Sequence, residues 1–183
     1  MRATTPGTSD SRTRNDLYRG TKAGRWERIA RGIYIPSDAP PADWDQIEAA
    51  TRRPDATICL ISALSHYELT DTIPERLDVA IPNGSRPPAT SGAIKWHRFD
   101  RDTFELGRDE TLIRGTSQKI GLYSAERTIA DTFRLRGTVG YETARDALKE
   151  WLRRGGKPAK LMEIATQLPR AKTPILNALD MMT

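Results

Sequence analysis

Histidine and cysteine, which often serve as bases, nucleophiles and metal ligands, are scarce in this chain. Its 183 residues include one cysteine and two histidines. A single thiol cannot close an internal disulfide, and His66 and His97 do not have the spacing of a zinc site. Cys59 lies in an apolar run and is expected to be a buried, unreactive thiol. The sequence therefore disfavours disulfide-stapled and zinc-dependent proteins.

Long hydrophobic runs are also missing. Apolar residues make up 37% of the chain, and no run approaches the roughly 20 residues that cross a membrane. The first residues are small, polar or charged and lack the apolar core of a secretory signal. We therefore expect a cytoplasmic protein with one substantial domain, or one domain and a small module.

Few patterns in the sequence favour catalysis. The glycines form no phosphate-binding loop. Ser62 and His66 stand four residues apart, but the serine lacks the glycine-flanked turn that exposes a catalytic nucleophile. The acidic segment 100–110 has oxygen ligands for a divalent cation, although a solvated loop is the simpler interpretation. We expect no catalytic residues, no metal, no cofactor and no enzymatic activity, and keep a metal-dependent enzyme as the least favoured alternative.

The net charge of +5 is unevenly distributed along the chain. Residues 1–37 contain eight basic and three acidic side chains, and residues 134–183 contain ten basic and five acidic ones. The middle of the chain, residues 38–133, has 11 basic and 16 acidic side chains. Two basic ends flanking an acidic middle are typical of binding to nucleic acid or to an acidic partner, or of solvated surfaces.

The first 37 residues predict two segments. Residues 1–16 are polar and aperiodic and predict a disordered basic arm. Residues 17–37 predict a β-hairpin, because two apolar-rich runs are separated by Arg31-Gly32 and closed by Pro36. Such a hairpin is either a wing that contacts DNA phosphates or an ordinary packed hairpin. The candidate DNA-binding residues are Arg12, Arg14, Arg19, Lys22, Arg25, Arg28 and Arg31.

Residues 38–183 predict one α+β domain that begins at a proline-rich joint. A small mixed sheet with flanking helices is expected, followed by a C-terminal helical bundle. The predicted strands are residues 56–60, 77–82, 94–99, 112–113 and 119–123, with an irregular acidic segment at 100–110. The predicted helices are residues 43–53, 62–69 and 124–134, with three more beyond residue 140.

The stretch from Ser124 to Arg134 links the last strand to the following helix. Ser124 is a good N-cap, and Arg127 and Asp131 are four residues apart and can form an ion pair along the helix. We interpret Ser124, Arg127 and Asp131 as a structural motif whose burial the sequence leaves open.

A basic stripe is expected on the helix over residues 141–154. Tyr141, Ala144, Leu148 and Trp151 form its core face, and Arg145, Lys149 and Arg153 share another face. The candidate partner-binding residues are these three basic residues and Arg154. This stripe is either a solvated surface, a second DNA-backbone surface or a contact for an acidic protein.

Four motifs, in order, resemble AbiEi, the antitoxin family of type IV toxin–antitoxin systems. They are Arg31-Gly32-Ile33-Tyr34, residues 62–70 (SALSHYELT), residues 77–82 (LDVAIP) and residues 124–131 (SAERTIAD). The resemblance covers residues 25–183, and the last motif is its most specific part.

The resemblance implies a phage-defence antitoxin with two activities. The C-terminal domain would counteract an AbiEii-like nucleotidyltransferase toxin encoded nearby, and an N-terminal winged helix would bind promoter DNA and repress the operon. Only about 24 residues precede Arg25 here, too few for the helices that normally precede a wing. The winged helix is therefore expected to be partial, reduced to its β-hairpin wing with weakened promoter binding, or else the true start lies upstream of Met1. A stand-alone DNA-binding repressor that uses the basic hairpin is the alternative function.

Overall fold

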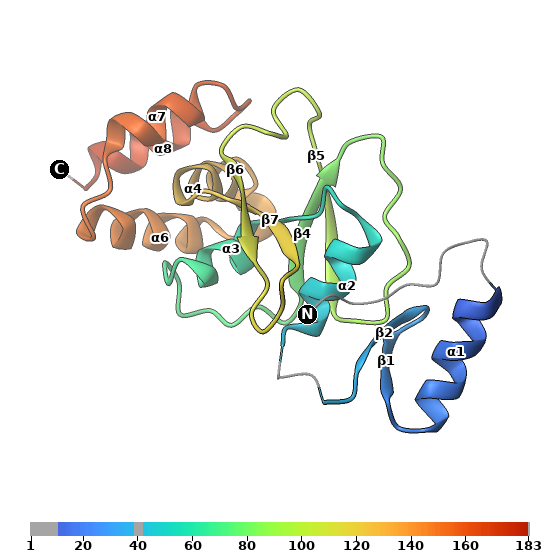
Figure 1. Cartoon of the computed structure of the whole chain (residues 1–183). Coiled ribbons are helices and arrows are strands. Elements are labelled where there is room, and N and C mark those ends of the chain that lie inside the picture. Colours follow the sequence, from blue (N-terminus) through green and yellow to red (C-terminus); the bar gives the residue numbers. More distant parts are fainter. Residues whose placement is uncertain (1–10, 39–41, 183) are drawn as a thin grey trace.

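The computed structural model describes residues 11–38 and 42–182, and within them it shows an α+β fold (Figure 1). The chain begins with helix α1 (Ser11–Lys22) and a hairpin of β1 (Trp26–Ala30) and β2 (Ile33–Pro36). Gly32 has φ of +77° in the turn, a conformation that glycine adopts without steric cost. The predicted hairpin is thus confirmed over residues 26–36, whereas residues 17–22 belong to α1.

A five-stranded mixed sheet forms the centre of the molecule. Its strand order is β5-β4-β3-β7-β6, with β4 parallel to β5, β3 parallel to β7 and the other two pairs antiparallel. The strands are β3 (Thr57–Ile58), β4 (Leu77–Pro82), β5 (Ile94–Phe99), β6 (Arg108–Leu112) and β7 (Lys119–Tyr123).

Helices cover both faces of this sheet. Residues alternate in direction along a strand, so Ile58, Val79 and Leu122 meet α2 (Trp44–Arg52) on one face. Ala80 and Tyr123 point to the other face, toward α3 (Leu60–His66) and α4 (Ala125–Arg134). The sheet is therefore a buried layer on which α3 and α4 are positioned.

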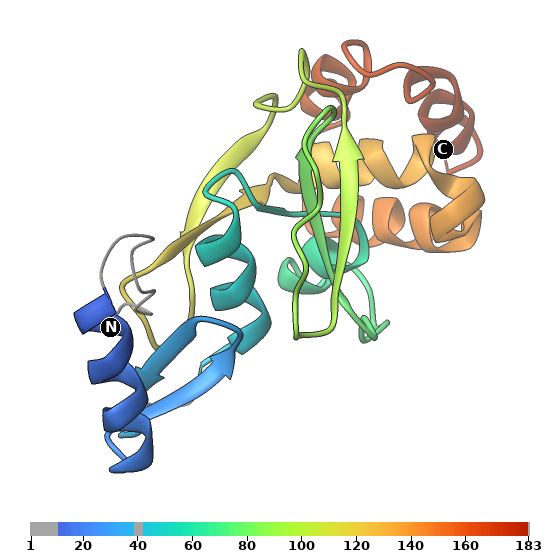
Figure 2. The same ribbon diagram turned by 90° about the vertical axis from the view of Figure 1, so that its right-hand side faces the viewer.

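The remaining helices pack around α4 at the far side of the molecule (Figure 2). Its buried residues Ile129 and Phe133 contact apolar side chains from the last three long helices, which include Leu148 and Ile175. These elements are α5 (Arg136–Val139), α6 (Tyr141–Arg153), α7 (Pro158–Ala165) and α8 (Lys172–Asp180). None of the helices in the described residues is long and apolar enough to cross a membrane.

Three expectations are corrected by the structure. Residues 11–16 are not a disordered arm but the start of α1, and residues 1–10 lie outside the described part of the chain. The acidic segment 100–110 is not wholly irregular, because β6 begins at Arg108 and pairs with β7. The strand expected over residues 56–60 is shorter, because α3 begins at Leu60, which has φ of +46°.

Candidate functional site

Helix α1 and the hairpin pack together as one unit. Leu17 is buried, and the Trp26 ring lies so close to Gly20 that a methyl group there would overlap it. The backbone N–H of Arg25 donates to the carbonyl of Gly20 at 2.8 Å. The unit is joined to the main domain by Arg52 of α2, whose Nη2 donates to the carbonyl of Arg31 at 2.7 Å.

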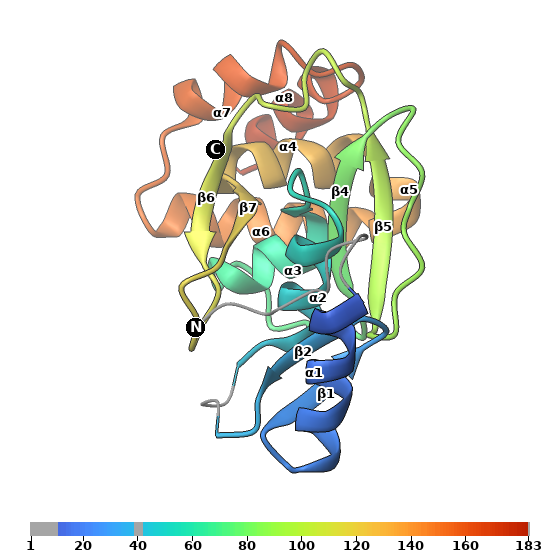
Figure 3. The same ribbon diagram turned by 45° about the vertical axis from the view of Figure 1, so that its right-hand side comes forward.

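The predicted DNA-binding side chains lie on the outside of this unit. Those described are all exposed: Arg19, Lys22, Arg25, Arg28 and Arg31. None of them forms an ion pair with a described carboxylate. The backbones of Arg12 and Arg14 belong to α1, and their side chains lie outside the described part. The structure therefore places five uncompensated positive charges at one end of the molecule, opposite α7 and α8 (Figure 3).

The Ser124 motif forms a buried joint between β7 and α4. The Ser124 hydroxyl accepts from the backbone N–H of Arg127 at 3.2 Å and so caps the helix. Arg127 Nε donates to Asp131 Oδ2 at 2.9 Å, and both side chains are 0% exposed. Arg134 Nε donates to the other carboxylate oxygen of Asp131 at 2.6 Å. Arg134 is not among the residues predicted for this motif, although its position three residues after Asp131 is a signal for an ion pair along the helix.

The Arg127 guanidinium connects α4 to the loop before β6. Its Nη1 donates to the carbonyls of Thr103 at 2.6 Å and Leu106 at 2.7 Å. Its carbon Cζ lies 4.5 Å from the centre of the Tyr123 ring, a cation–π distance. Its Nη2 is buried without a hydrogen-bond partner. Two arginines thus share one carboxylate in an aromatic environment, and burial raises the pKa of Tyr123.

The positive charge of the predicted basic stripe on α6 is largely neutralised by carboxylates of the same helix. Arg145 Nη2 lies 3.0 Å from Asp146 Oδ1, and Arg153 and Arg154 each lie 2.6 Å from Glu150. Hydrogen bonds from Arg153 and Arg154 lower the pKa of Glu150 to about 2. Among the candidate partner-binding residues, this leaves the exposed Lys149 as the one without such a carboxylate.

Arg154 does not share the outer face of α6 with the other members of the stripe. Its guanidinium reaches back to the end of α3 and donates to the carbonyls of Tyr67 at 3.2 Å and Glu68 at 2.7 Å. Arg154 therefore links α6 to the segment after α3, and the stripe consists of Arg145, Lys149 and Arg153.

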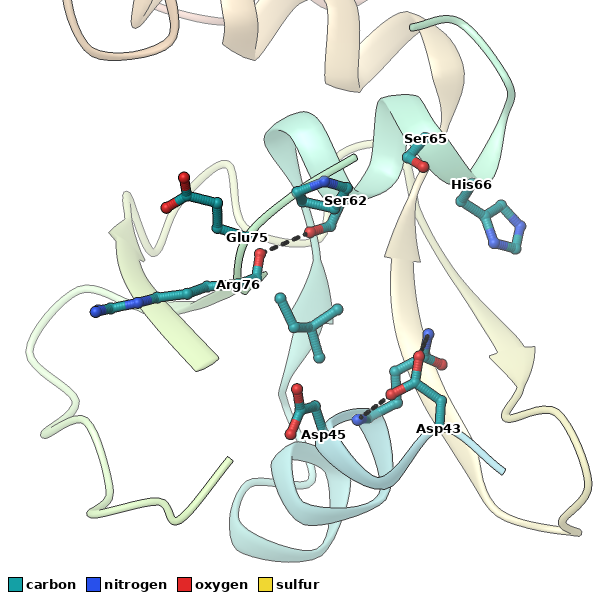
Figure 4. Close-up of a pocket in the computed structure, with 10 residues that line it drawn as sticks. Asp43, Asp45, Ser62, Ser65, His66, Glu75 and Arg76 are labelled. Atoms are coloured by element: carbon teal, nitrogen blue, oxygen red, sulfur yellow. Dashed lines mark hydrogen bonds between the residues drawn. The ribbon is translucent and has the colours of Figure 1, made fainter. Parts of the chain in front are cut away.

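Ser62 and His66 line a cavity of about 300 Å³ between α2, α3 and the start of β4, but they point apart (Figure 4). The Ser62 hydroxyl accepts from the backbone N–H of Asp78 at 2.8 Å and lies 3.4 Å from the carbonyl of Arg76, to which it donates. Its hydrogen bonds are thus used to fasten α3 to β4. No hydrogen bond among the described residues joins Ser62 to His66.

Several of the acidic side chains between residues 100 and 110 each interact with a different neighbour and do not gather at one point. Glu105 lies 3.6 Å from Arg108, Glu110 lies 3.4 Å from Lys119, and Asp100 accepts from the backbone of Asp102. Within the residues that the structure describes, no group of three histidine, cysteine, aspartate or glutamate side chains has the geometry of a metal site.

A buried carboxylate that the sequence did not single out holds the long loop between β4 and β5. Glu48 of α2 is 2% exposed and accepts from the backbone N–H groups of Ser91 at 3.0 Å and Gly92 at 2.8 Å. Burial and the nearby Asp43 raise the pKa of Asp45, which lies beside the same loop. The negative charge of Glu48 is therefore matched by backbone donors and by Arg52, whose Nη2 lies 3.5 Å from Glu48 Oε1.

Replacing Glu48 is expected to loosen this loop. In Glu48→Gln, an amide N–H₂ faces backbone donors, so we expect about 1–3 kcal/mol of lost stability and faster hydrogen exchange at Ser91 and Gly92. Hydrogen exchange by NMR measures both effects. The matched control is Glu75→Gln, which neutralises an exposed carboxylate. Unchanged exchange at Ser91 in Glu48→Gln contradicts the prediction.

Comparison with known proteins adds no family assignment. No protein-family model matches the chain, and no curated protein matches it.

Proposed function

We propose that the chain is a non-catalytic antitoxin of the AbiEi type, which counteracts a nucleotidyltransferase toxin. One observation carries this proposal: three of the four motifs that resemble the family occupy contacting elements, α3, β4 and α4. Ser62 in the second motif fastens α3 to Asp78 in the third, at 2.8 Å. The most specific motif, around Arg127, forms the buried joint of α4. Because these motifs contact one another in the fold, they support the proposal that this chain and the AbiEi family share a domain.

Co-expression tests the antitoxin proposal. A nucleotidyltransferase toxin of the AbiEii type is expected to stop growth of a bacterial host when expressed alone. Co-expression of the chain is expected to restore growth, and colony counts measure the effect. If the soluble, folded chain leaves an active toxin of this class fully inhibitory, the proposal is wrong.

The second candidate function is DNA binding by α1 and the hairpin. The specific observation in its favour is the set of five exposed basic side chains on this unit, none of them paired with a described carboxylate. Charge reversal there separates the two functions. We expect Arg19→Glu, Arg25→Glu and Arg31→Glu together to lose DNA binding and to keep growth rescue. Retained DNA binding in this variant would contradict DNA binding by this unit, and loss of growth rescue would mean that the unit serves the antitoxin function instead.

A further inference from the structure

Helix α1 is the outermost element at its end of the molecule, because the hairpin lies between it and α2 (Figure 2). Leu17 and Gly20 are buried, and Gly20 lies against the ring of Trp26 in β1. This packing turns the opposite side of the helix outward. Four side chains on that outward side are exposed: Asn15, Tyr18, Arg19 and Lys22. The outward side of α1 therefore combines an aromatic ring and an amide with positive charge.

Tyr18 is the most exposed aromatic side chain among the described residues, at 58%. The ammonium group of Lys22 lies 5.2 Å from the centre of its ring, which is a cation–π distance. The lysine thus lies over the ring while more than half of the tyrosine stays open to solvent. Tyr18 therefore offers aromatic surface for stacking, with a cation directly beside it.

The carboxylates of α1 and β1 point away from Tyr18. Asp16 is the one acidic residue of α1, and its place two positions before Tyr18 corresponds to a rotation of about 200° around the helix. Glu27 alternates with Trp26 along β1, so its side chain lies on the face of the hairpin opposite α1. Neither carboxylate therefore faces the ring, and the charged neighbours of the ring on the outward side of α1 are basic.

This combination favours a nucleic acid with unpaired bases. Proteins that bind single strands combine positive charge along the backbone with aromatic rings on which bases stack. In a duplex each base is covered by its neighbours, so an exposed ring gains a stacking partner only from a base outside the stack. Asn15 has amide donors and an acceptor that a base edge can pair with. Carboxylates of an acidic protein would pair with the charges but would offer no flat surface to the ring.

We propose that the helix–hairpin unit, α1 with β1 and β2, binds single-stranded nucleic acid. An unpaired base stacks on Tyr18, and Arg19 and Lys22 hold the neighbouring phosphates. The inference deepens the second candidate function and rests on it, because it specifies the form of nucleic acid that the unit takes. Every base has a flat face, so this binding is independent of sequence.

The test uses the full chain and labelled strands of about 12 thymidylates, with binding followed by fluorescence anisotropy. We expect the single strand to bind more tightly than a duplex of the same length. Tyr18→Ala is expected to weaken binding of the single strand by about tenfold and to change duplex binding by less than about twofold. Tyr18→Phe keeps the ring and is expected to bind as the wild type does, which excludes a contact through the phenol hydroxyl.

The salt dependence of the affinity separates stacking from charge. Tyr18→Ala leaves every charge in place, so we expect its affinity to be lower at each salt concentration with an unchanged slope against salt. Arg19→Gln is expected to reduce that slope by about one. The matched control is Tyr141→Ala, which removes an exposed tyrosine from α6 and is expected to bind normally. Circular dichroism checks that each variant is folded.

Uridylate RNA and deoxyuridylate DNA distinguish the two sources of unpaired bases, because these strands differ only in the 2′-hydroxyl. The strand that binds more tightly identifies the source, and either order agrees with stacking on Tyr18. Displacement of the strand by polyglutamate at the same concentration of charge would overturn the proposal in favour of an acidic protein.

Failure of this proposal differs from failure of the function on which it rests. If Tyr18→Ala binds the single strand as tightly as the wild type, or if the duplex binds more tightly than the single strand, the proposal is overturned and DNA binding by the unit stands. If neither form binds at low salt, the second candidate function is wrong and the proposal falls with it.

Discussion

Asp131→Ala is expected to reduce the free energy of unfolding by about 3–5 kcal/mol, because it leaves buried positive charge without a counter-ion. Asp131 is 0% exposed and accepts from Arg127 at 2.9 Å and from Arg134 at 2.6 Å. Its removal therefore strands two guanidinium groups, one of them fully buried. Urea unfolding followed by circular dichroism measures the loss.

Arg127→Met is the control that separates charge from volume. It removes the guanidinium whose Nη2 has no partner and leaves Asp131 paired with Arg134. The remaining buried pair is neutral, and methionine fills much of the space, so we expect a smaller loss than in Asp131→Ala. Arg127→Ala also leaves a cavity, so its loss of stability is expected to lie between those of Arg127→Met and Asp131→Ala.

The double variant Arg127→Ala, Asp131→Ala is expected to lose less free energy of unfolding than the sum of the two single variants, because each single change already breaks the same interaction. Additive losses would mean that the two side chains stabilise the joint independently. If Asp131→Ala were as stable as the wild type, the buried ion pair would not stabilise the joint at all.

The local features of this fold could be predicted where they depend on nearby residues. Gly32 between two apolar-rich runs predicts the hairpin, and Ser124 after an apolar strand predicts the cap of α4. Helix α1 was missed because Leu17 is its one buried apolar side chain among those described, too little for a helical period. The predicted strand 112–113 overlaps β6 only at Leu112, because Arg108–Leu112 is an edge strand whose charged residues hide the apolar pattern of a strand.

The candidate sites depend only in part on local patterns. Burial of Arg127 requires the Tyr123 ring and the carbonyls of Thr103 and Leu106, which a separate loop supplies. Spacing predicts the α6 stripe, and Asp146 and Glu150, whose places in the sequence already favour a solvated face, lie close enough to compensate it. Helical spacing predicts the face on which a charged side chain lies. Whether that charge is neutralised depends on the rotamers of the neighbouring side chains.

DNA affinity is expected to fall about 500-fold between about 50 mM and about 200 mM salt, if about five phosphates are neutralised. The five basic side chains on α1 and the hairpin are exposed, and the described carboxylates do not pair with them, so each can release a counter-ion. Phosphate contacts carry no sequence information, so we expect promoter and random fragments to bind alike. Fluorescence anisotropy at several salt concentrations measures both the slope and the specificity.

Arg19→Glu with Arg25→Glu and Arg31→Glu is the variant that assigns this binding to the helix–hairpin unit. The side chains of these three arginines form no hydrogen bond or ion pair with other described residues, so the fold is expected to survive. The matched control reverses three exposed charges elsewhere, in Arg86→Glu, Arg114→Glu and Lys160→Glu. Because both variants have the same net charge, a purely global electrostatic effect weakens them equally. We expect the helix–hairpin variant to lose binding and the control to keep most of it. Equal losses would place the DNA contact elsewhere, and tight promoter-selective binding at physiological salt would mean that base edges are read as well.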